Sequence, residues 1–166
     1  MNFWSFRGRS LAMELFDLLA ERGIIPALKA KTKKQALQDL AELGSTITGL
    51  ASRDILEGLL QRERLGSTGL GGGIAIPHAK FKGLDRIHCV FARLDQPLEF
   101  ESIDNEPVDL IFLLLAPEHA SGDHLKALAR ISRFLREPHA LERLRATRDR
   151  KGLYAILTQP VTSHAA

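Results

Sequence analysis

The stretch "VDLIFLLLAP", residues 108 to 117, contains the longest apolar run of the sequence, Leu110 to Ala116. A strand that is apolar at nearly every position is typical of a sheet covered on both faces, because successive side chains point to opposite sides. The run is too short for a membrane helix, which needs about 20 apolar residues. The stretch therefore predicts a central strand between two layers, and we expect no membrane insertion.

Weaker strand patterns precede this run. Residues 86–94 ("RIHCVFARL") are rich in β-forming residues, and residues 73–79 ("GIAIPHA") predict a brief strand that runs into a turn. Residues 24–28 ("IIPAL") predict a short strand at a sheet edge, because Pro26 donates no ladder hydrogen bond. Residues 97–107 predict a hairpin or loop. The middle of the chain thus predicts a sheet.

Helical periodicity dominates both ends of the chain. Apolar residues at helical spacing predict helices over residues 10–22, 33–43, 52–65, 123–137, 138–147 and 152–159. Thr32 is a typical N-cap for the second helix, while Gly23 and Gly66 supply stops for the first and third. Helices before and after a group of strands predict an α/β fold, with a central sheet between helices on both faces.

The composition is typical of a single globular domain. With 166 residues, 45% of them hydrophobic and 26% charged, the chain is sized for one globular domain with its own core. The net charge of +3 is mild and scattered, so we expect no nucleic-acid partner. Cys89 is the one cysteine, so no disulfide can form within the chain, which fits a cytoplasmic protein. Residues 1–9 lack the apolar stretch of a secretory signal.

The stretch "GSTGLGGGIAIPHAK", residues 66–80, is dense in glycine and suggests a nucleotide loop. A P-loop needs a lysine followed by a hydroxyl residue after its last glycine, and no such pair follows here. A dinucleotide fingerprint begins at Gly69 and Gly71, but Ile74 stands where the third glycine belongs. The loop also leads from a helix into a strand, the reverse order of both motifs. The pattern does not favour nucleotide binding.

The histidines do not form a metal-binding pattern. His119 and His124 are five residues apart, which suits neither a helix face nor a strand face. Cys89 has no partner at the spacing of a metal motif. The histidines expected to be ordinary strand or surface residues are His88, His139 and His164. We expect no metal and no other cofactor.

His78 and His124 differ from the other histidines in context. His78 ends the apolar segment "IAIP", and His124 lies in the first turn of a helix, behind "SGD". The start of a helix has unpaired N–H groups and a dipole that favours an anion. Brought together, the two residues would place a largely neutral imidazole beside a phosphate-binding helix start, where it can attack phosphorus. Both are candidates for phosphoryl transfer.

The longer motif "RERLGSTGLGGGIAIPHAK" (residues 62–80) resembles a known phosphorylation signature. It is that of the fructose/mannitol-class enzyme IIA domains of the bacterial phosphoenolpyruvate:sugar phosphotransferase system. The nitrogen-related enzyme IIA is most similar, with the usual wording R-E-x-x-G-S-T-G-[IL]-G-x-G-[IV]-A-I-P-H-G-K. The resemblance continues through "FARLDQPLEFESIDNEPVDLIFLLLAPE" and "DHLKALARISRFL".

The resemblance implies the domain plan and the fold. It implies one type-2 EIIA domain over residues 1–166, with a core at about 24–157, an N-terminal arm at 1–9 and a tail at 159–166. The implied fold is a mixed β-sheet sandwiched between helices.

The resemblance also implies roles for individual residues. His78 would be phosphorylated on Nε2, His124 would support the phosphoryl group, and Arg62 would neutralise its charge. The residues implied to shape the surface on which the carrier docks are Gly66, Ser67, Thr68, Gly69, Gly71 and Gly73. The chain departs from the signature at Gly72, in place of asparagine or a similar residue, and at Ala79, in place of glycine. Both replacements are small.

The implied function is that of a regulatory histidine phosphotransferase. It would accept phosphate from an HPr-like carrier (NPr) and regulate targets such as sensor kinases or potassium transporters. Two alternatives stay open: a sugar-specific enzyme IIA that passes phosphate to a IIB domain, and a binding module whose histidines are never phosphorylated. The chain carries no fused IIB segment, and "GSTG" with "AIPH" favours the nitrogen type. Arg62, His78 and His124 occurring together argue against the binding module.

Overall fold

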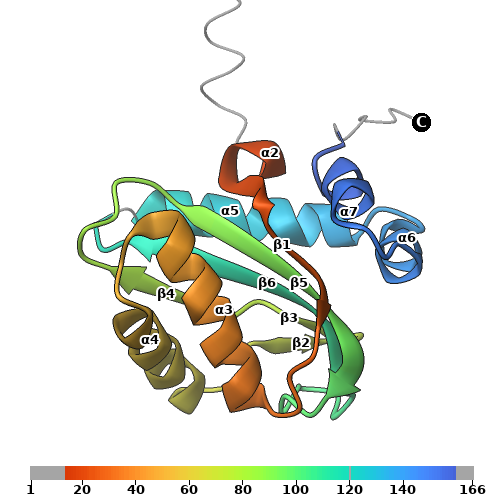
Figure 1. Cartoon of the computed structure of the whole chain (residues 1–166), viewed down its shortest axis with the longest axis horizontal. Helices are drawn as coiled ribbons and strands as arrows, with labels where there is room; N and C mark the ends of the chain where they lie inside the picture. The colour runs from red at the N-terminus through yellow and green to blue at the C-terminus, as the bar shows by residue number, and fades with distance from the viewer. Residues whose placement is uncertain (1–13, 120, 160–166) are drawn as a thin grey trace, which may run out of the picture.

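The structure, a computed structural model, describes residues 14–119 and 121–159. The predicted arm, the first residues of the predicted helix 10–22 and most of the predicted tail, with His164, lie outside the described residues. Helices and strands follow in the order α2 (Leu15–Leu18), β1 (Leu19–Leu28), α3 (Lys33–Thr48), α4 (Ser52–Arg64), β2 (Gly69–Gly71), β3 (Ile74–Ala75), β4 (His78–Phe81), β5 (His88–Leu98), β6 (Val108–Pro117), α5 (Ser121–Leu135), α6 (Ala140–Ala146) and α7 (Arg150–Leu157) (Figure 1).

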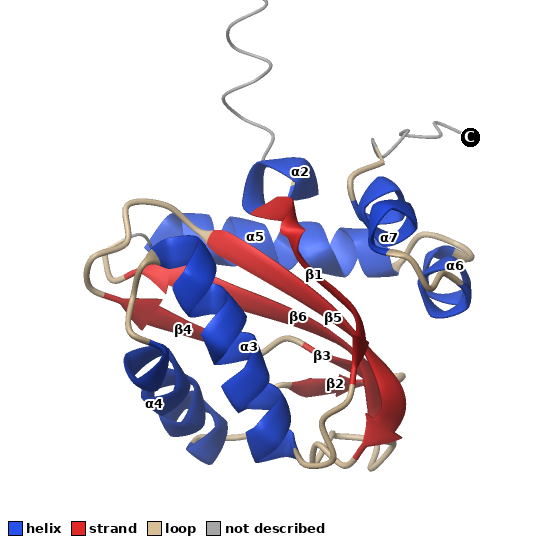
Figure 2. Cartoon of the chain, in the orientation of Figure 1, coloured by secondary structure: helices blue, strands red, loops and turns tan. Residues whose placement is uncertain are grey.

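The strands form one mixed sheet in the order β1-β5-β6-β3-β2, with β4 also paired to β6 (Figure 2). β5 runs antiparallel to β6, whereas β1 is parallel to β5, and both β3 and β4 are parallel to β6. β2 closes an antiparallel hairpin with β3. The implied mixed sheet is therefore confirmed.

The central strand predicted from the apolar run is confirmed, because β6 has the predicted bounds and Leu110 to Ala116 are all 0% exposed. Its residues alternate between two cores. Leu110, Phe112 and Leu114 belong to a core shared with α2, α5, α6 and α7. The intervening Ile111 and Leu113 belong to a second core shared with α3 and α4. Helices thus cover both faces of the sheet, as predicted.

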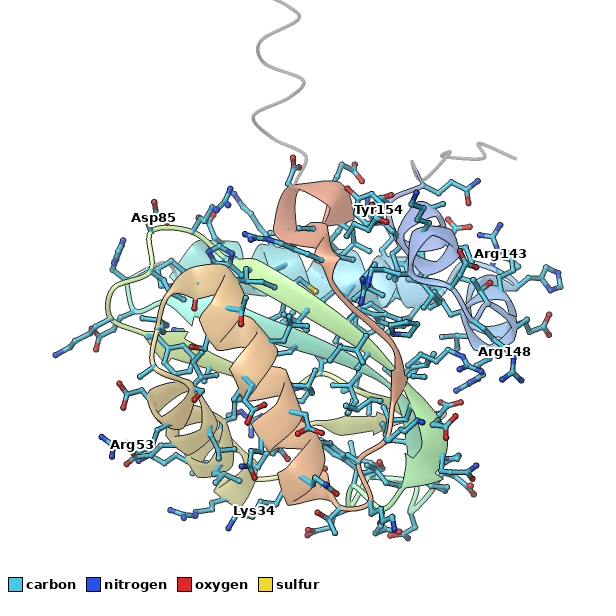
Figure 3. The ribbon with its side chains drawn as sticks, in the orientation of Figure 1. Lys34, Arg53, Asp85, Arg143, Arg148 and Tyr154 are labelled. Atoms are coloured by element: carbon cyan, nitrogen blue, oxygen red, sulfur yellow. The ribbon has the colours of Figure 1, made fainter. Side chains whose placement is uncertain are left out.

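Charged side chains lie on the outer surface of both helical layers. Lys34 and Arg53 on one helical layer, Arg143 and Arg148 on the other, and Asp85 in a loop are exposed and project away from the sheet (Figure 3). Among the described residues, no helix combines the length and the apolar content that crossing a membrane requires.

The predicted helix over residues 10–22 is wrong beyond Leu18. The chain turns into β1 at Leu19, and Gly23 lies inside this strand instead of ending a helix. Leu19 pairs with Cys89 and Ile24 with Phe91 of β5, with an irregularity in the register between the two pairs. Hydrogen bonding to β5 holds these residues in the sheet, and this tertiary interaction outweighs the local preference of the leucine spacing for a helix. The strand also buries Leu19, so this leucine is not exposed by the change. The predicted edge position of Pro26 is confirmed, since β1 ends the strand order.

The remaining boundaries differ modestly from the sequence predictions. Thr32 caps α3 by accepting a hydrogen bond from the Gln35 N–H at 3.1 Å, as expected. The helix runs to Thr48 and ends at Gly49, which adopts the left-handed conformation (φ 83°) favoured at helix ends. The helix predicted from Pro138 begins at Ala140. β2 was not predicted, because a three-residue strand of "GLG" has no alternating pattern.

Candidate functional site

His78 lies at the start of an edge strand. β3 and β4 follow β6 in one register, Ile74 beside Leu110 and His78 beside Leu114, with Ile76 and Pro77 between the two strands. Pro77 has no N–H to donate, but its carbonyl accepts a hydrogen bond from the Leu114 N–H at 3.0 Å. β4 has no strand on its other side among the described residues, so His78 lies at an edge of the sheet.

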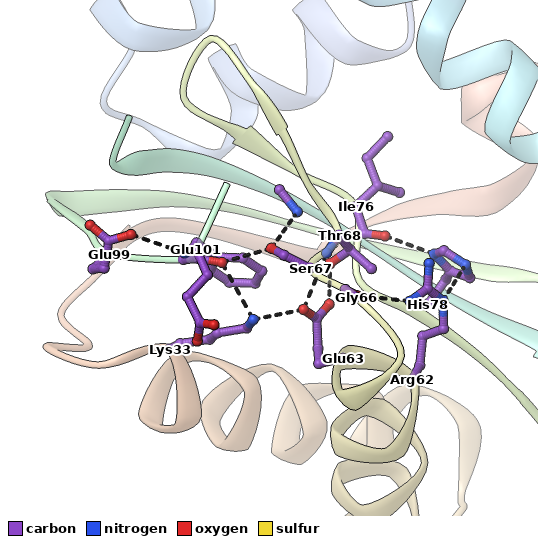
Figure 4. A network of polar contacts seen from close by, with 12 residues as sticks. Lys33, Arg62, Glu63, Gly66, Ser67, Thr68, Ile76, His78, Glu99 and Glu101 are labelled. Carbon is purple, nitrogen blue, oxygen red and sulfur yellow. Dashed lines mark hydrogen bonds and ion pairs between the residues drawn. The ribbon is translucent and has the colours of Figure 1, made fainter. Parts of the chain in front are cut away.

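The contacts of the His78 ring define its tautomer. Nδ1 lies 2.8 Å from the carbonyl oxygen of Ile76, and a carbonyl can only accept, so Nδ1 carries the proton. Nε2 is then unprotonated, and it accepts a hydrogen bond from Arg62 Nε at 3.4 Å (Figure 4). The lone pair of Nε2 is therefore the nucleophilic position of this ring.

Arg62 reaches the ring from the last turn of α4. Its Nη1 donates to the Gly66 carbonyl at 2.9 Å, which fixes the guanidinium beside His78. α4 can approach β4 closely because Gly58, one turn before Arg62, faces Phe81 without a side chain. A guanidinium held in this way presents further N–H donors to an oxyanion.

His124 reaches the same ring from the other face of the sheet. It lies in the first turn of α5, and its ring centroid is 4.9 Å from that of His78 at an interplanar angle of 53°. The residue is 8% exposed, and its Nδ1 has no hydrogen-bond partner among the described residues. The structure thus brings together the three residues that the sequence singled out, Arg62, His78 and His124.

Burial and positive charge act on both rings. Burial lowers the pKa of His78, and Arg62 lowers it further, although the Ile76 hydrogen bond and Glu63 act in the opposite direction. Burial likewise lowers the pKa of His124, with added contributions from His78, Lys80 and Arg62. Both rings are therefore mainly neutral near pH 7, as a nucleophile and a hydrogen-bond donor to an anion require.

The glycine stretch is divided between two places. Gly66 is exposed beside Arg62, and the Ser67 hydroxyl donates to the Phe100 carbonyl at 2.7 Å. Thr68 and Gly69 are buried, so a protein docking on this surface would not reach them. A Cβ at Gly69 would lie 2.3 Å from Ser102 Oγ, which explains the glycine at this position.

Gly71 and Gly73 lie in the turn of the β2–β3 hairpin, away from His78. The Gly73 carbonyl accepts from the Leu110 N–H, whereas His78 pairs with Leu114, four residues or about 13 Å further along β6. The intervening Gly72 donates to Asp104 at 2.9 Å and accepts from Arg145 at 2.7 Å. All three glycines of this turn have positive φ, which few other residues adopt. Their position supports a structural role.

The other candidate groups lie elsewhere. The pKa of His88 is lowered, chiefly by burial. His88 lies on β5 opposite Leu115 of β6, a residue of the second core, so it is on the other face of the sheet from His78, which pairs with Leu114. His139 is exposed ahead of α6. Within residues 14–119 and 121–159, no group of three or more His, Cys, Asp or Glu side chains is arranged to hold a metal.

Sequence reasoning missed one part of the site, the buried carboxylate of Glu63. It is bonded to Lys33 and Thr68 behind the histidine. The signal was the Arg-Glu pair at positions 62 and 63, but only the arginine was given a role.

The sequence and the structure of the chain are similar to those of one protein family. Residues 17–159 match the family model described as phosphoenolpyruvate-dependent sugar phosphotransferase system, EIIA 2. A nitrogen regulatory protein of Bradyrhizobium diazoefficiens is 53% identical over 153 residues, which span 92% of this chain and 100% of the relative. The nitrogen regulatory protein of Escherichia coli K12 is 40% identical over 148 residues, 88% of this chain and 90% of the relative. The crystal structure of the nitrogen regulatory protein IIA-Ntr from Neisseria meningitidis superposes with a TM-score of 0.82 at 34% identity, covering 87% of this chain and 99% of that one.

Proposed function

Because the chain belongs to the EIIA type 2 family of the phosphotransferase system, within its nitrogen regulatory IIA-Ntr group, we propose that it is a regulatory histidine phosphocarrier. His78 accepts a phosphoryl group on Nε2 from the phosphohistidine of an HPr-like carrier (NPr), and its phosphorylation state regulates target proteins. The observation that carries the proposal is the bond between Nδ1 and the Ile76 carbonyl, because it leaves the lone pair of Nε2 pointing at Arg62.

The proposed reaction exchanges one N–P bond for another. The Nε2 lone pair of His78 forms a bond to phosphorus while the N–P bond of the carrier histidine breaks, and the carrier ring leaves with that electron pair. Nδ1 keeps its proton throughout, and the Ile76 carbonyl stabilises the positive charge that develops on the ring. Since both sides of the exchange are phosphohistidines, the protein mainly positions and neutralises charge.

Arg62 and His124 flank the transferred group from opposite faces of the sheet. The Arg62 guanidinium donates a hydrogen bond to Nε2 of His78, and after transfer its N–H groups would donate to the phosphoryl oxygens instead. His124 is neutral and its ring packs against that of His78, so a ring N–H of His124 can donate a hydrogen bond to the same oxygens. Lys80 adds positive charge on the next outward position of β4.

Regulation would follow from the charge that the phosphoryl group brings. A phosphoryl group adds roughly two negative charges at neutral pH. Leu65, 85% exposed, and Leu125, 67% exposed, are next to Gly66 and His124 in sequence, and we propose that they form an apolar rim beside that charge. A partner that docks on this rim would sense the change directly. We propose this surface for the HPr-like carrier and for regulated targets such as sensor kinases or potassium transporters.

Radiolabelled phosphoenolpyruvate, enzyme I and an HPr-like carrier provide the test. We expect the wild-type protein and a His88→Ala control to be labelled equally, His78→Ala to remain unlabelled, and His124→Gln to be labelled at least about tenfold more slowly. Label in His78→Ala equal to wild type would refute the site. A folded wild-type protein that stays unlabelled would refute the phosphocarrier function.

A further inference from the structure

Lys33 and Glu63 form an ion pair, little exposed to solvent, near the proposed acceptor histidine. The side chain of Glu63, next to Arg62 on α4, is 6% exposed, and its Oε2 lies 2.8 Å from Nζ of Lys33, which is 19% exposed. Removing a carboxylate from water is costly unless several donors satisfy it. The surroundings of Glu63 provide them.

Three donors converge on the Glu63 carboxylate. Besides Lys33, the Thr68 N–H donates to Oε2 at 3.1 Å, and the Thr68 hydroxyl donates to Oε1. Lys33 in turn donates to the Phe100 carbonyl at 3.3 Å and lies over the Phe100 ring. The start of α3, the end of α4 and the segment after β5 are thereby joined at one carboxylate (Figure 4).

A continuous chain of hydrogen bonds leads from this carboxylate to the histidine. The Thr68 carbonyl accepts from the Ile76 N–H at 3.0 Å, and the Ile76 carbonyl accepts from Nδ1 of His78 at 2.8 Å. The residue before a proline is restricted to extended conformations, so fixing the N–H of Ile76 also limits the direction of its carbonyl. The next residue, Pro77, is also held, because its carbonyl accepts a hydrogen bond from the Leu114 N–H.

We propose that Glu63 is a positioning residue for phosphoryl transfer: held by Lys33, it fixes Thr68 and, through Thr68, the Ile76 carbonyl that keeps the proton on Nδ1 of His78. This role deepens the proposed function and rests on it for its kinetic consequence. The Glu63 charge also supports the basicity of the acceptor, since it opposes the lowering of the His78 pKa by Arg62. Glu63 itself touches neither the ring nor the transferred group.

The tautomer of His78 can be measured without any carrier, by ¹⁵N-detected NMR of the imidazole nitrogens at neutral pH. Three variants are compared with wild type: Glu63→Gln, Thr68→Val, and Glu57→Gln as a matched control. Thr68→Val removes a single hydroxyl at nearly constant volume, so it serves where Glu63→Gln does not fold. Glu57 is exposed on the same helix, and its variant makes the same charge change away from the network. We expect the Nδ1–H tautomer to dominate in wild type and Glu57→Gln, and both tautomers to be populated in Glu63→Gln and Thr68→Val. Folded variants with wild-type tautomer populations would overturn the positioning role.

The kinetic readout separates this role from a general structural one. With phosphorylated HPr-like carrier as donor, we expect kcat of Glu63→Gln to fall roughly tenfold, the equivalent of about one lost hydrogen bond, with KM for the carrier unchanged. A rise in KM alone would overturn the role, because it indicates damage to docking. Thr68→Ser should restore the rate lost in Thr68→Val. If no variant and no wild-type protein accepts phosphate while the tautomer shift is seen, the proposed function fails and the positioning of His78 stands.

Discussion

At the scale of single residues, the proposed phosphoryl transfer depends on which nitrogen of His78 carries the proton. The Ile76 carbonyl sets this choice at 2.8 Å, and Arg62 approaches the other nitrogen. Burial lowers the pKa of His78 and keeps the ring neutral near pH 7, and the positive charge of Arg62 acts in the same direction. The same burial makes the rings expensive to protonate, which has a measurable effect on stability.

Acidification should destabilise the fold before most carboxylates titrate. The pKa values of His78, His88 and His124 are lowered by burial, so each ring has a lower pKa folded than unfolded, where it is about 6.5. As pH falls below about 6.5, the unfolded chain binds protons first, and stability is lost until the folded pKa values are passed. Each ring adds at most about 1.4 kcal/mol per pH unit to the slope, less where water screens it.

Urea unfolding at pH 7.5, 6.5 and 5.5 measures this effect. We expect the free energy of unfolding to decrease on acidification, and to decrease less steeply in His124→Gln. Stability that is constant or rises from pH 7.5 to 5.5 would show that the rings are not held neutral.

The three candidate residues that the structure brings together could be found from the sequence, because each has a local signal. His78 ends an apolar strand, His124 occupies a helix start, and Arg62 belongs to a recognisable motif. The Nδ1 tautomer and the Glu63 network could not be found, because both depend on contacts with Ile76, Thr68 and Lys33 that only the folded chain creates.

At the scale of elements, the contact between α4 and β4 sets the distance from Arg62 to His78. Gly58 lies four residues before Arg62, on the same face of α4, and packs against Phe81. A Cβ at this position would lie 2.7 Å from Phe81 Cε1 and 2.9 Å from Cζ, too close for real atoms. The missing side chain therefore lets the helix carry its arginine to the sheet edge.

Gly58→Ala should push α4 away from β4. Overpacking costs about 1–3 kcal/mol, and the better helix propensity of alanine returns up to about 1 kcal/mol, so we expect a net loss of about 1–2 kcal/mol. Labelling of His78 should also slow as Arg62 moves away. Gly122→Ala is the control, since it would meet nothing within 4 Å and should be neutral or stabilising. Unchanged stability and labelling in Gly58→Ala would contradict this account of the helix position.

The elements most poorly predicted are those whose form depends on sheet pairing. The leucines of residues 15–19 fit a helix, but Leu19 pairs with Cys89 and begins a strand. The glycine-rich turn has no hydrophobic pattern, and its shape comes from Asp104 and Arg145 binding Gly72. By contrast, β6 was predicted to the residue, because complete burial on both faces leaves an unambiguous apolar run.

At the scale of the whole molecule, the sheet separates two hydrophobic cores. Its inner strands β5 and β6 contribute side chains to both cores. The fold class followed from the order of helices and strands, whereas the strand order did not, because nothing in the sequence states which strands are neighbours. Cys89, on β5 between β1 and β6, is 2% exposed and reports on the integrity of this centre.

The Cys89 thiol should react only when the molecule unfolds. Burial raises its pKa to about 12, so that roughly one thiol in ten thousand is ionised at pH 8 even where a reagent could enter. We expect negligible modification by Ellman's reagent in the native protein and one thiol per chain in concentrated guanidinium chloride. Rapid modification of the native protein would mean that the sheet opens readily around β5.

The central claim is that Nε2 of His78 is the phosphoryl acceptor, and the attachment site can be seen directly. The ¹⁵N-labelled protein is phosphorylated by enzyme I, an HPr-like carrier and phosphoenolpyruvate, and nitrogen–phosphorus couplings are recorded by NMR. We expect one coupled nitrogen, Nε2 of His78, with Nδ1 still protonated. A coupling at Nδ1 of His78, or at any nitrogen of another histidine, would contradict the account.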